Sequence, residues 1–208
     1  MRKAMCLVVA IGTIGSTASF AGGPGFGVRS GGLASLAGTY NESTSTAELL
    51  QPGSIAGVFL QQQVARHYGI EAGVDLGWAP FADAYREEPG KKPMFVVPAV
   101  TFCNRVSLPM GPLAPYAVAG VGVFPWRFTR DGLRGDPVTV EGEALKKMSA
   151  GLVGGVGLEL RFSRWAAVFG EARVAYVLSR DRFLFGSGFS EQTLLSIGGG
   201  VSVFPWGR

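Results

Sequence analysis

The chain has 208 residues, of which 32 are glycine, 11% are aromatic and only 16% are charged. This length suits one domain of ordinary size, and the composition excludes a disordered chain, which needs high charge and few apolar residues. Without Arg2 and Lys3, the 19 basic residues become 17 against 15 acidic ones, so the net charge falls from +4 to +2 and indicates no nucleic-acid partner.

The N-terminus predicts a secretory signal peptide over residues 1–21. Arg2 and Lys3 precede a short apolar run, residues 6–14, and Ser19 and Ala21 are small residues at the positions that a signal peptidase recognises. We therefore expect cleavage after Ala21 and a mature domain over residues 22–208. The alternative, a membrane anchor, is disfavoured because the apolar run is too short and ends in Gly, Ser and Thr.

After the signal peptide, alternating or glycine-rich segments separated by turn residues predict eight β-strands. In chain order, these segments span residues 25–41, 54–65, 68–80, 93–106, 114–127, 149–162, 165–178 and 193–204. The segments that begin at residues 25, 54 and 114 alternate less cleanly than the others. No later segment offers the ~18 uninterrupted apolar residues of a transmembrane helix.

The segment 68–78 (YGIEAGVDLGW) alternates most clearly. Its apolar face has aromatic rings at both ends, Tyr68 and Trp78, and its other face carries glycines with Glu71 and Asp75. At about 3.3 Å per residue the two rings lie roughly 30 Å apart, which is about the thickness of the hydrocarbon core of a bilayer. The pattern predicts a strand of a transmembrane barrel, with an aromatic ring at each membrane interface.

The predicted strands over residues 149–162 and 165–178 repeat this alternation, and their polar faces carry charged residues. Because the two strands form a hairpin, we expect their charges to pair across it inside the barrel, where an isolated charge is very costly. The expected interior charges of these strands are Glu159, Arg161, Glu171 and Arg173. The expected interface rings are Phe162 and Tyr176.

The connections between the predicted strands alternate in length. Residues 66–67, 107–113 and 163–164 form short turns, whereas residues 42–53, 81–92, 128–148 and 179–192 form longer polar loops. Outer-membrane barrels have short periplasmic turns and long external loops, whereas a soluble sandwich has no reason to sort its loops in this way. The alternation therefore places Tyr68 at the periplasmic interface and Trp78 at the external one.

The block 151–176 (GLVGGVGLELRFSRWAAVFGEARVAY) resembles the last hairpin of the small outer-membrane β-barrel family, which includes OmpA-type, OmpX-type and OmpW-type proteins, and residues 115–122 (PYAVAGVG) are similar to its fifth strand. The resemblance implies an all-β, antiparallel, up-and-down, eight-stranded transmembrane β-barrel. It also implies export through the periplasm to the outer membrane of a Gram-negative-type cell. Where family members end on an aromatic residue, this chain has two residues after Trp206.

The expected partners follow from this resemblance. They are outer-membrane lipid, lipopolysaccharide and, during insertion, the barrel-assembly machinery. We expect a monomer that binds no nucleic acid. The basic pairs at residues 91–92 and 146–147 either lie at a charged lipid headgroup layer or simply end the strands.

Few residues could carry chemistry. His67, the only histidine, lies in a tight turn with no hydroxyl beside it in the sequence, so we expect a turn residue rather than a catalytic base. The His-x-Ser pattern of outer-membrane lipid A deacylases is absent. One histidine and one mature cysteine, Cys103, cannot build a usual zinc site, so no metal or cofactor is expected. We expect Cys103 to act as a small buried hydrophobe, and residues 87–88 to form a solvated acidic cluster.

Four functions remain open. The first is a non-enzymatic outer-membrane barrel with a structural or interaction role, whose lumen is plugged by paired charges; the same charges could instead line a gated polar pathway. The second is a narrow channel or a conduit for small hydrophobic ligands, gated by residues 128–148. The third is a barrel lipid hydrolase, which the isolation of His67 disfavours. The fourth is a soluble periplasmic barrel with an apolar interior, which reverses the pattern of residues 68–78.

Overall fold

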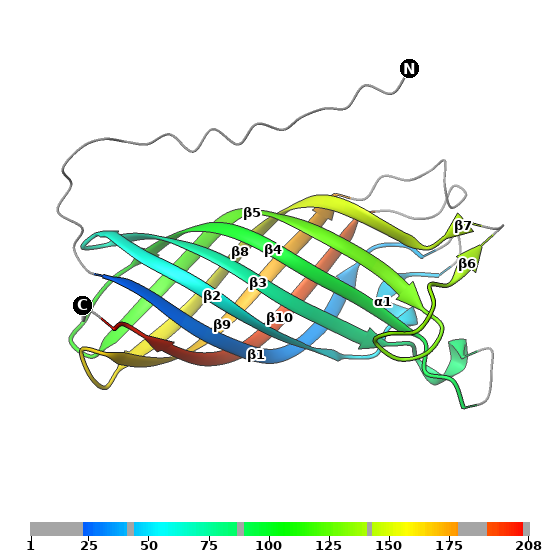
Figure 1. The fold of residues 1–208 in the computed structure, drawn as a ribbon, viewed down its shortest axis with the longest axis horizontal. Coiled ribbons are helices and arrows are strands. Elements are labelled where there is room, and N and C mark those ends of the chain that lie inside the picture. The colour runs from blue at the N-terminus through cyan, green and yellow to red at the C-terminus, as the bar shows by residue number, and fades with distance from the viewer. Residues whose placement is uncertain (1–22, 41–43, 87–89, 141–142, 179–190, 206–208) are drawn as a thin grey trace, which may run out of the picture.

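The protein is a closed antiparallel β-barrel in the computed structural model (Figure 1). The structure describes residues 23–40, 44–86, 90–140, 143–178 and 191–205, so the expected signal peptide lies outside the described residues. The strands of the wall are β1 (Pro24–Ala37), β2 (Gly53–Ala65), β3 (Tyr68–Pro80), β4 (Met94–Ser107), β5 (Leu113–Thr129), β8 (Lys146–Arg161), β9 (Ala166–Leu178) and β10 (Gln192–Val203). Each pairs with the next, and β10 pairs with β1, which confirms the predicted eight-stranded, up-and-down barrel.

The ends of the strands differ most from the prediction at β1 and β8. β1 ends at Ala37 because Gly38 adopts a φ of 134°, a conformation that favours glycine and breaks the strand. β8 begins at Lys146, before the predicted residue 149, because the β5–β8 hairpin continues above the wall, where the Phe128 amide donates to the Leu145 carbonyl at 3.0 Å. The loop of this hairpin also holds a small ribbon that the sequence did not predict, formed by β6 (Thr139–Val140) and β7 (Glu143–Ala144).

The two ends of the barrel are unlike. One end, which we call the short-turn end, carries the tight connections together with the start of β1 and the end of β10 (Figure 1). The other, the long-loop end, carries α1 (Thr46–Leu49), the 3-10 helix η1 (Asp83–Tyr85) and the β6–β7 ribbon. The short and long connections therefore lie at opposite ends of the barrel, as the predicted alternation of loop lengths requires. No helix among the described residues is long and apolar enough to cross a membrane.

The outer surface of the wall is apolar. In β3, Tyr68, Val74 and Leu76 are exposed, whereas Glu71 and Asp75 are buried in the interior, as the alternation predicted. Large exposed apolar side chains continue around the wall on the other strands, among them Val58, Val100, Phe102, Val121, Leu152, Val156 and Ile197. A soluble monomer rarely exposes an apolar surface of this extent, whereas a bilayer-spanning barrel requires one. The apolar wall contradicts the alternative of a soluble periplasmic barrel.

Candidate functional site

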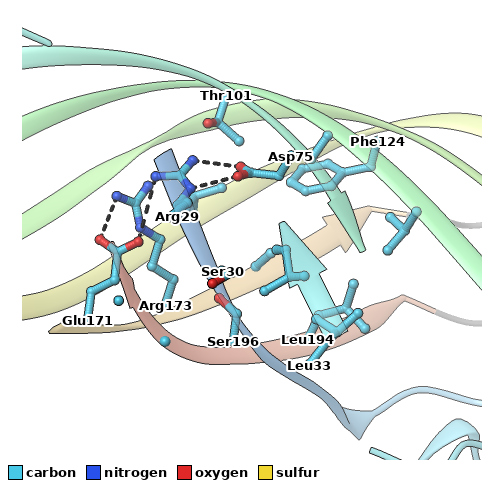
Figure 2. A pocket seen from close by; sticks show the side chains of 17 residues that line it. Arg29, Ser30, Leu33, Asp75, Thr101, Phe124, Glu171, Arg173, Leu194 and Ser196 are labelled. Atoms are coloured by element: carbon cyan, nitrogen blue, oxygen red, sulfur yellow. Dashed lines mark hydrogen bonds and ion pairs between the residues drawn. The ribbon is translucent and has the colours of Figure 1, made fainter. Parts of the chain in front are cut away.

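Charged side chains from several strands meet inside the barrel. Arg29 on β1 donates from Nε and Nη2 to the two carboxylate oxygens of Asp75, both at 2.6 Å, and from Nη1 to Glu71 at 2.8 Å. The carboxylate of Glu171 on β9 lies 3.7 Å from the same Nη1. Figure 2 shows Arg29 facing Asp75, with Glu171 and Arg173 beside it. One buried arginine therefore connects acidic residues of β3 and β9 across the interior.

Glu71 is the acidic residue that contacts several arginines, as Arg29 contacts several carboxylates. It lies between arginines of three strands. It accepts hydrogen bonds from Arg29 and from Arg173, each at 2.8 Å, and its second oxygen lies 4.0 Å from Arg105. Arg173 also donates to Glu171 at 2.8 Å. Glu71 is only 1% exposed. A buried carboxylate of this kind is stable only with such partners.

A second group of charges lies nearer the short-turn end. Arg105 donates to Glu159 at 2.7 Å, and Arg161 donates to the other oxygen of Glu159 at the same distance. The guanidinium of Arg105 also lies over the ring of Tyr116, 3.6 Å from the ring centroid. The hydroxyl of Tyr116 donates to Glu171 at 3.0 Å, so it links this group to the charges around Arg29.

Together these residues form one set, which we call the charge network. It consists of Arg29, Arg105, Arg161, Arg173, Glu71, Asp75, Glu159 and Glu171. Four arginines and four carboxylates make the network formally neutral. Eight strands leave an interior just wide enough for side chains to fill, so the network occupies the middle of the lumen.

All six charges that the sequence placed in the lumen belong to this network, but their expected pairing was wrong. We expected Glu159 and Arg161 to pair with Glu171 and Arg173 across the β8–β9 hairpin. The register instead sets glycines of β8 opposite Glu171 and Arg173, and Phe169 opposite Glu159. The ion pairs therefore form within each strand, between residues two apart, or reach strands farther round the barrel.

The sequence did not identify Arg29 or Arg105 as interior charges. On β1 the only signal was glycine at Gly25, Gly27 and Gly31, on the same face as Arg29. On β4 the outward face carries the polar Asn104, which obscured the direction of Arg105. Interior glycines recur where a large side chain needs space: a Cβ on Gly73 would lie 2.6 Å from Nη2 of Arg29.

Aromatic rings close the interior at the long-loop end. We call this group the aromatic cap, and it comprises Tyr40, Phe81, Phe95, Trp126 and Phe128. Phe128 is 0% exposed, and the centroids of the other rings lie between 5.0 and 5.9 Å from its own. Leu49 of α1 and the adjacent Leu50 are buried in the same apolar cluster. The loop residues thus fold inward over the mouth.

A small cavity of about 60 Å³ lies between the aromatic cap and the charge network. Its walls are mostly apolar, and Figure 2 shows Leu33, Leu194 and Phe124 at one side of it and the charged side chains at the other. This volume has room for only a few water molecules. The charged side chains of Arg29, Asp75, Glu171 and Arg173 form the wall of the cavity on the side of the network.

The barrel wall beside this cavity has a local interruption between β4 and β5. Val96 pairs with Arg127 and Val100 pairs with Val123, but no residues between them pair. Because the register is unchanged across the gap, Pro98 lies opposite Pro125. Neither proline has an amide hydrogen to donate to the ladder. Two strands of an otherwise continuous wall are therefore held together less strongly at this height.

The four expected interface rings lie near the two ends of the wall. Tyr68 and Phe162 are exposed at the short-turn end, and Trp78 and Tyr176 lie on the outward faces of β3 and β9 toward the long-loop end. The hydroxyl of Tyr68 donates to Asn104, and that of Tyr176 donates to Glu191 at 2.7 Å. Their position at membrane interfaces stays a prediction. Trp165, exposed beside Phe162, is a further ring that the sequence analysis did not single out.

The remaining candidate residues form no recognisable reactive site. The imidazole Nδ1 of His67 lies 3.1 Å from the backbone carbonyl of Ser107, and no hydroxyl contact of this ring occurs among the described residues. Cys103 is fully buried and faces the interior. In the described part of the chain, no group of histidine, cysteine and acidic residues has an arrangement that could hold a metal ion. Residues 87–88 and Trp206 lie outside the described residues.

Solved structures share this architecture. The structure of neisserial surface protein A aligns with a TM-score of 0.54 and 12% sequence identity, over 86% of this chain and 96% of that chain. This chain has the fold of a small outer-membrane β-barrel. The outer-membrane barrel fold accounts for the apolar wall, the even strand number and the sorted loops.

Two further outer-membrane barrel structures align less well. The attachment invasion locus protein of Yersinia pestis, crystallised with a heparin analogue, aligns with a TM-score of 0.49 and 10% identity, over 86% of this chain and 99% of that chain. OprG from Pseudomonas aeruginosa aligns with a TM-score of 0.46 and 15% identity, over 87% and 96%. The sequence itself matches no protein-family model and no curated protein.

Proposed function

We propose that the protein is a non-enzymatic barrel of the outer membrane with a closed interior and a structural or interaction role. The observation that carries the proposal is that two separate groups of side chains, the charge network and the aromatic cap, fill the lumen in series. A filled lumen leaves the long-loop end and the outer wall as the surfaces on which a partner can act. The apolar wall and the predicted signal peptide support a location in the outer membrane of a Gram-negative-type cell.

The contacts of the charge network support a plug rather than a gated polar pathway. An ion could pass only if pairs such as Arg29–Asp75, with its two 2.6 Å hydrogen bonds, separated. Breaking one buried pair costs about 3–5 kcal/mol because it leaves an uncompensated charge. The neutrality of the network also means that no unpaired charge is left to attract an ion.

Recordings in planar bilayers test the closed interior. The wild-type protein is expected to be silent, and so is Phe128→Ala, because the network still fills the lumen. A combined variant, Arg29→Met with Asp75→Asn and Phe128→Ala, weakens both groups and is expected to show brief conducting events. Arg66→Met in the exposed β2–β3 turn removes one charge outside the lumen and serves as the control. Regular conductance steps in the wild type would refute the closed interior.

A second candidate function is a conduit for small hydrophobic ligands, and the proline pair in the wall favours it. The interruption at Pro98 and Pro125 lies beside the apolar cavity, so a small apolar molecule could pass between the cavity and the bilayer if the two strands separated. Replacing both prolines by valine supplies the missing donors and would slow the uptake of an apolar dye into proteoliposomes. Pro115→Val, in the paired part of β5, is the control. Equal uptake by all three proteins would exclude the conduit.

Enzymatic activity has no support in the contacts of His67. Lipid A extracted after overexpression of the protein is expected to be chemically unchanged. Loss of an acyl chain from this lipid would instead indicate the barrel hydrolase.

A further inference from the structure

Two cations lie directly opposite one another on the outer wall. Arg127 on β5 is the register partner of Lys146 on β8, and both lie on the outward faces of their strands. Directly opposite residues of an antiparallel pair have Cβ atoms about 5 Å apart, so like charges at such a position repel. Arg127 donates one hydrogen bond, from Nη2 to the Leu133 carbonyl at 2.7 Å. Among the described residues no carboxylate forms an ion pair with Arg127 or Lys146.

Further cations surround this pair. The loop that follows β5 is attached to Lys92, whose amide donates to Asp131 at 3.1 Å and whose carbonyl accepts from Gly132 at 2.9 Å. We call the resulting exposed cluster the basic surface, and it comprises Lys92, Arg127, Arg130, Arg134 and Lys146. The sequence of the same loop also contains four acidic residues, Asp131, Asp136, Glu141 and Glu143. The positive charge that lacks an ion pair among the described residues is therefore local, at Arg127 and Lys146.

The height of the basic surface on the wall matches a membrane interface. The pairing register forms one row across four strands, from Trp78 through Val96 and Arg127 to Lys146. Tryptophan is enriched at the level of the lipid headgroups. The exposed apolar wall begins at Met148, two residues along β8 from Lys146, and at Val123, four residues along β5 from Arg127. The cations thus lie at the boundary between the apolar band and the long loops.

We propose that the basic surface binds the phosphate groups of a lipid headgroup in the outer leaflet, of the phosphorylated glycolipid type found in lipopolysaccharide. A phosphate between Arg127 and Lys146 replaces their repulsion by charge-assisted hydrogen bonds, and the guanidinium fork suits phosphate oxygens. Arg130 and Arg134 lie in the loop that Arg127 contacts at Leu133, and Lys92 is hydrogen-bonded to the same loop, so these cations can contact further anionic groups of the headgroup layer. This inference rests on the proposed outer-membrane location, with the long-loop end outside.

Binding of purified, refolded protein in neutral micelles to lipopolysaccharide tests the proposal. Arg127→Gln with Lys146→Gln is expected to weaken binding on the order of tenfold, since hydrogen bonds to charged groups are lost. The matched control, Arg66→Gln with Arg164→Gln, removes two exposed cations from the short-turn end and should retain wild-type affinity. Removing the phosphates from lipopolysaccharide should have the same effect: the wild-type protein should bind the phosphate-free lipid only as weakly as the double variant binds the intact lipid. Equal loss in the control, or unchanged binding without phosphate, would overturn the assignment.

A stability measurement on the same proteins keeps the test decisive. In phosphate-free neutral micelles, Arg127→Gln with Lys146→Gln should unfold at a higher urea concentration than the wild type because the repulsion is gone. Added lipopolysaccharide should reverse this order. A less stable double variant in both conditions would show that the pair is structural and would refute the site. These assays measure lipid binding and stability of the purified protein and depend on neither its cellular location nor its conductance. A negative result here would therefore leave the closed-barrel proposal standing.

Discussion

Replacing Arg29 by methionine is expected to destabilise the barrel more than replacing any exposed arginine. The substitution removes four contacts at the centre of the network and leaves Asp75, Glu71 and Glu171 facing one another with reduced compensation. Loss of one partner of a buried ion pair costs about 3–5 kcal/mol. The cation–π contact with Phe59, at 5.3 Å, adds a smaller loss.

The same reasoning predicts that a second substitution restores part of this loss. Asp75→Asn in the Arg29→Met background leaves three arginines and three glutamates, so the network is again neutral. The double variant should be more stable than the sum of the single variants implies, by about 1–3 kcal/mol. Arg66→Met, in the exposed turn between β2 and β3, should change stability by no more than about 0.5 kcal/mol.

Urea titration in lipid vesicles measures these differences, with the folded fraction followed by heat-modifiable migration on gels. Strictly additive costs for Arg29→Met and Asp75→Asn would refute a direct ionic coupling in the lumen. An Arg29→Met variant as stable as Arg66→Met would show that the interior is hydrated enough to screen the network.

Three further substitutions probe the wall, the packing of the strands and the cap. Val74→Arg places a charge on the apolar outer face, where Val74 is 54% exposed, and should cost about 2–4 kcal/mol in vesicles. Gly120→Ala should reduce the yield of folded protein because its Cβ would lie 2.1 Å from the Phe102 carbonyl oxygen, whereas Gly154→Ala, with nothing within 4 Å, should fold normally; equal yields would contradict the close approach of β4 and β5. Phe128→Ala should lower the free energy of unfolding by about 3–5 kcal/mol, and a smaller loss would indicate that the cap is loosely packed.

The strands could be predicted because the wall separates two solvents. Wherever lipid lies outside and polar groups lie inside, the sequence alternates strictly, and β3 was predicted at both of its ends. The difference in polarity between the two faces was smaller in β1, where Ser30 and Gly32 lie on the outward face and interrupt its apolar residues. Arg29 was missed for this reason, although the glycines beside it on the interior parity carried the same signal as those of β3.

The partners inside the lumen could not be predicted, because they depend on closure of the barrel. Arg173 and Glu71 are 102 residues apart in sequence and meet only when β9 and β3 face one another across the interior. The aromatic cap has the same origin. The sequence placed Tyr40 at the end of the first predicted strand and Phe81 at the start of an external loop. Phe81 is buried and Tyr40 is partly buried because these segments fold back over the mouth. Local patterns fix which face a side chain occupies, and closure decides what it contacts.

Cell fractionation of the expressed full-length chain, followed by gel migration with and without heating, tests most directly that this protein spans the outer membrane as a closed barrel. The account predicts that the protein is found in the outer-membrane fraction and that its unheated form migrates differently from its heated form. A soluble periplasmic product with no shift on heating would contradict it.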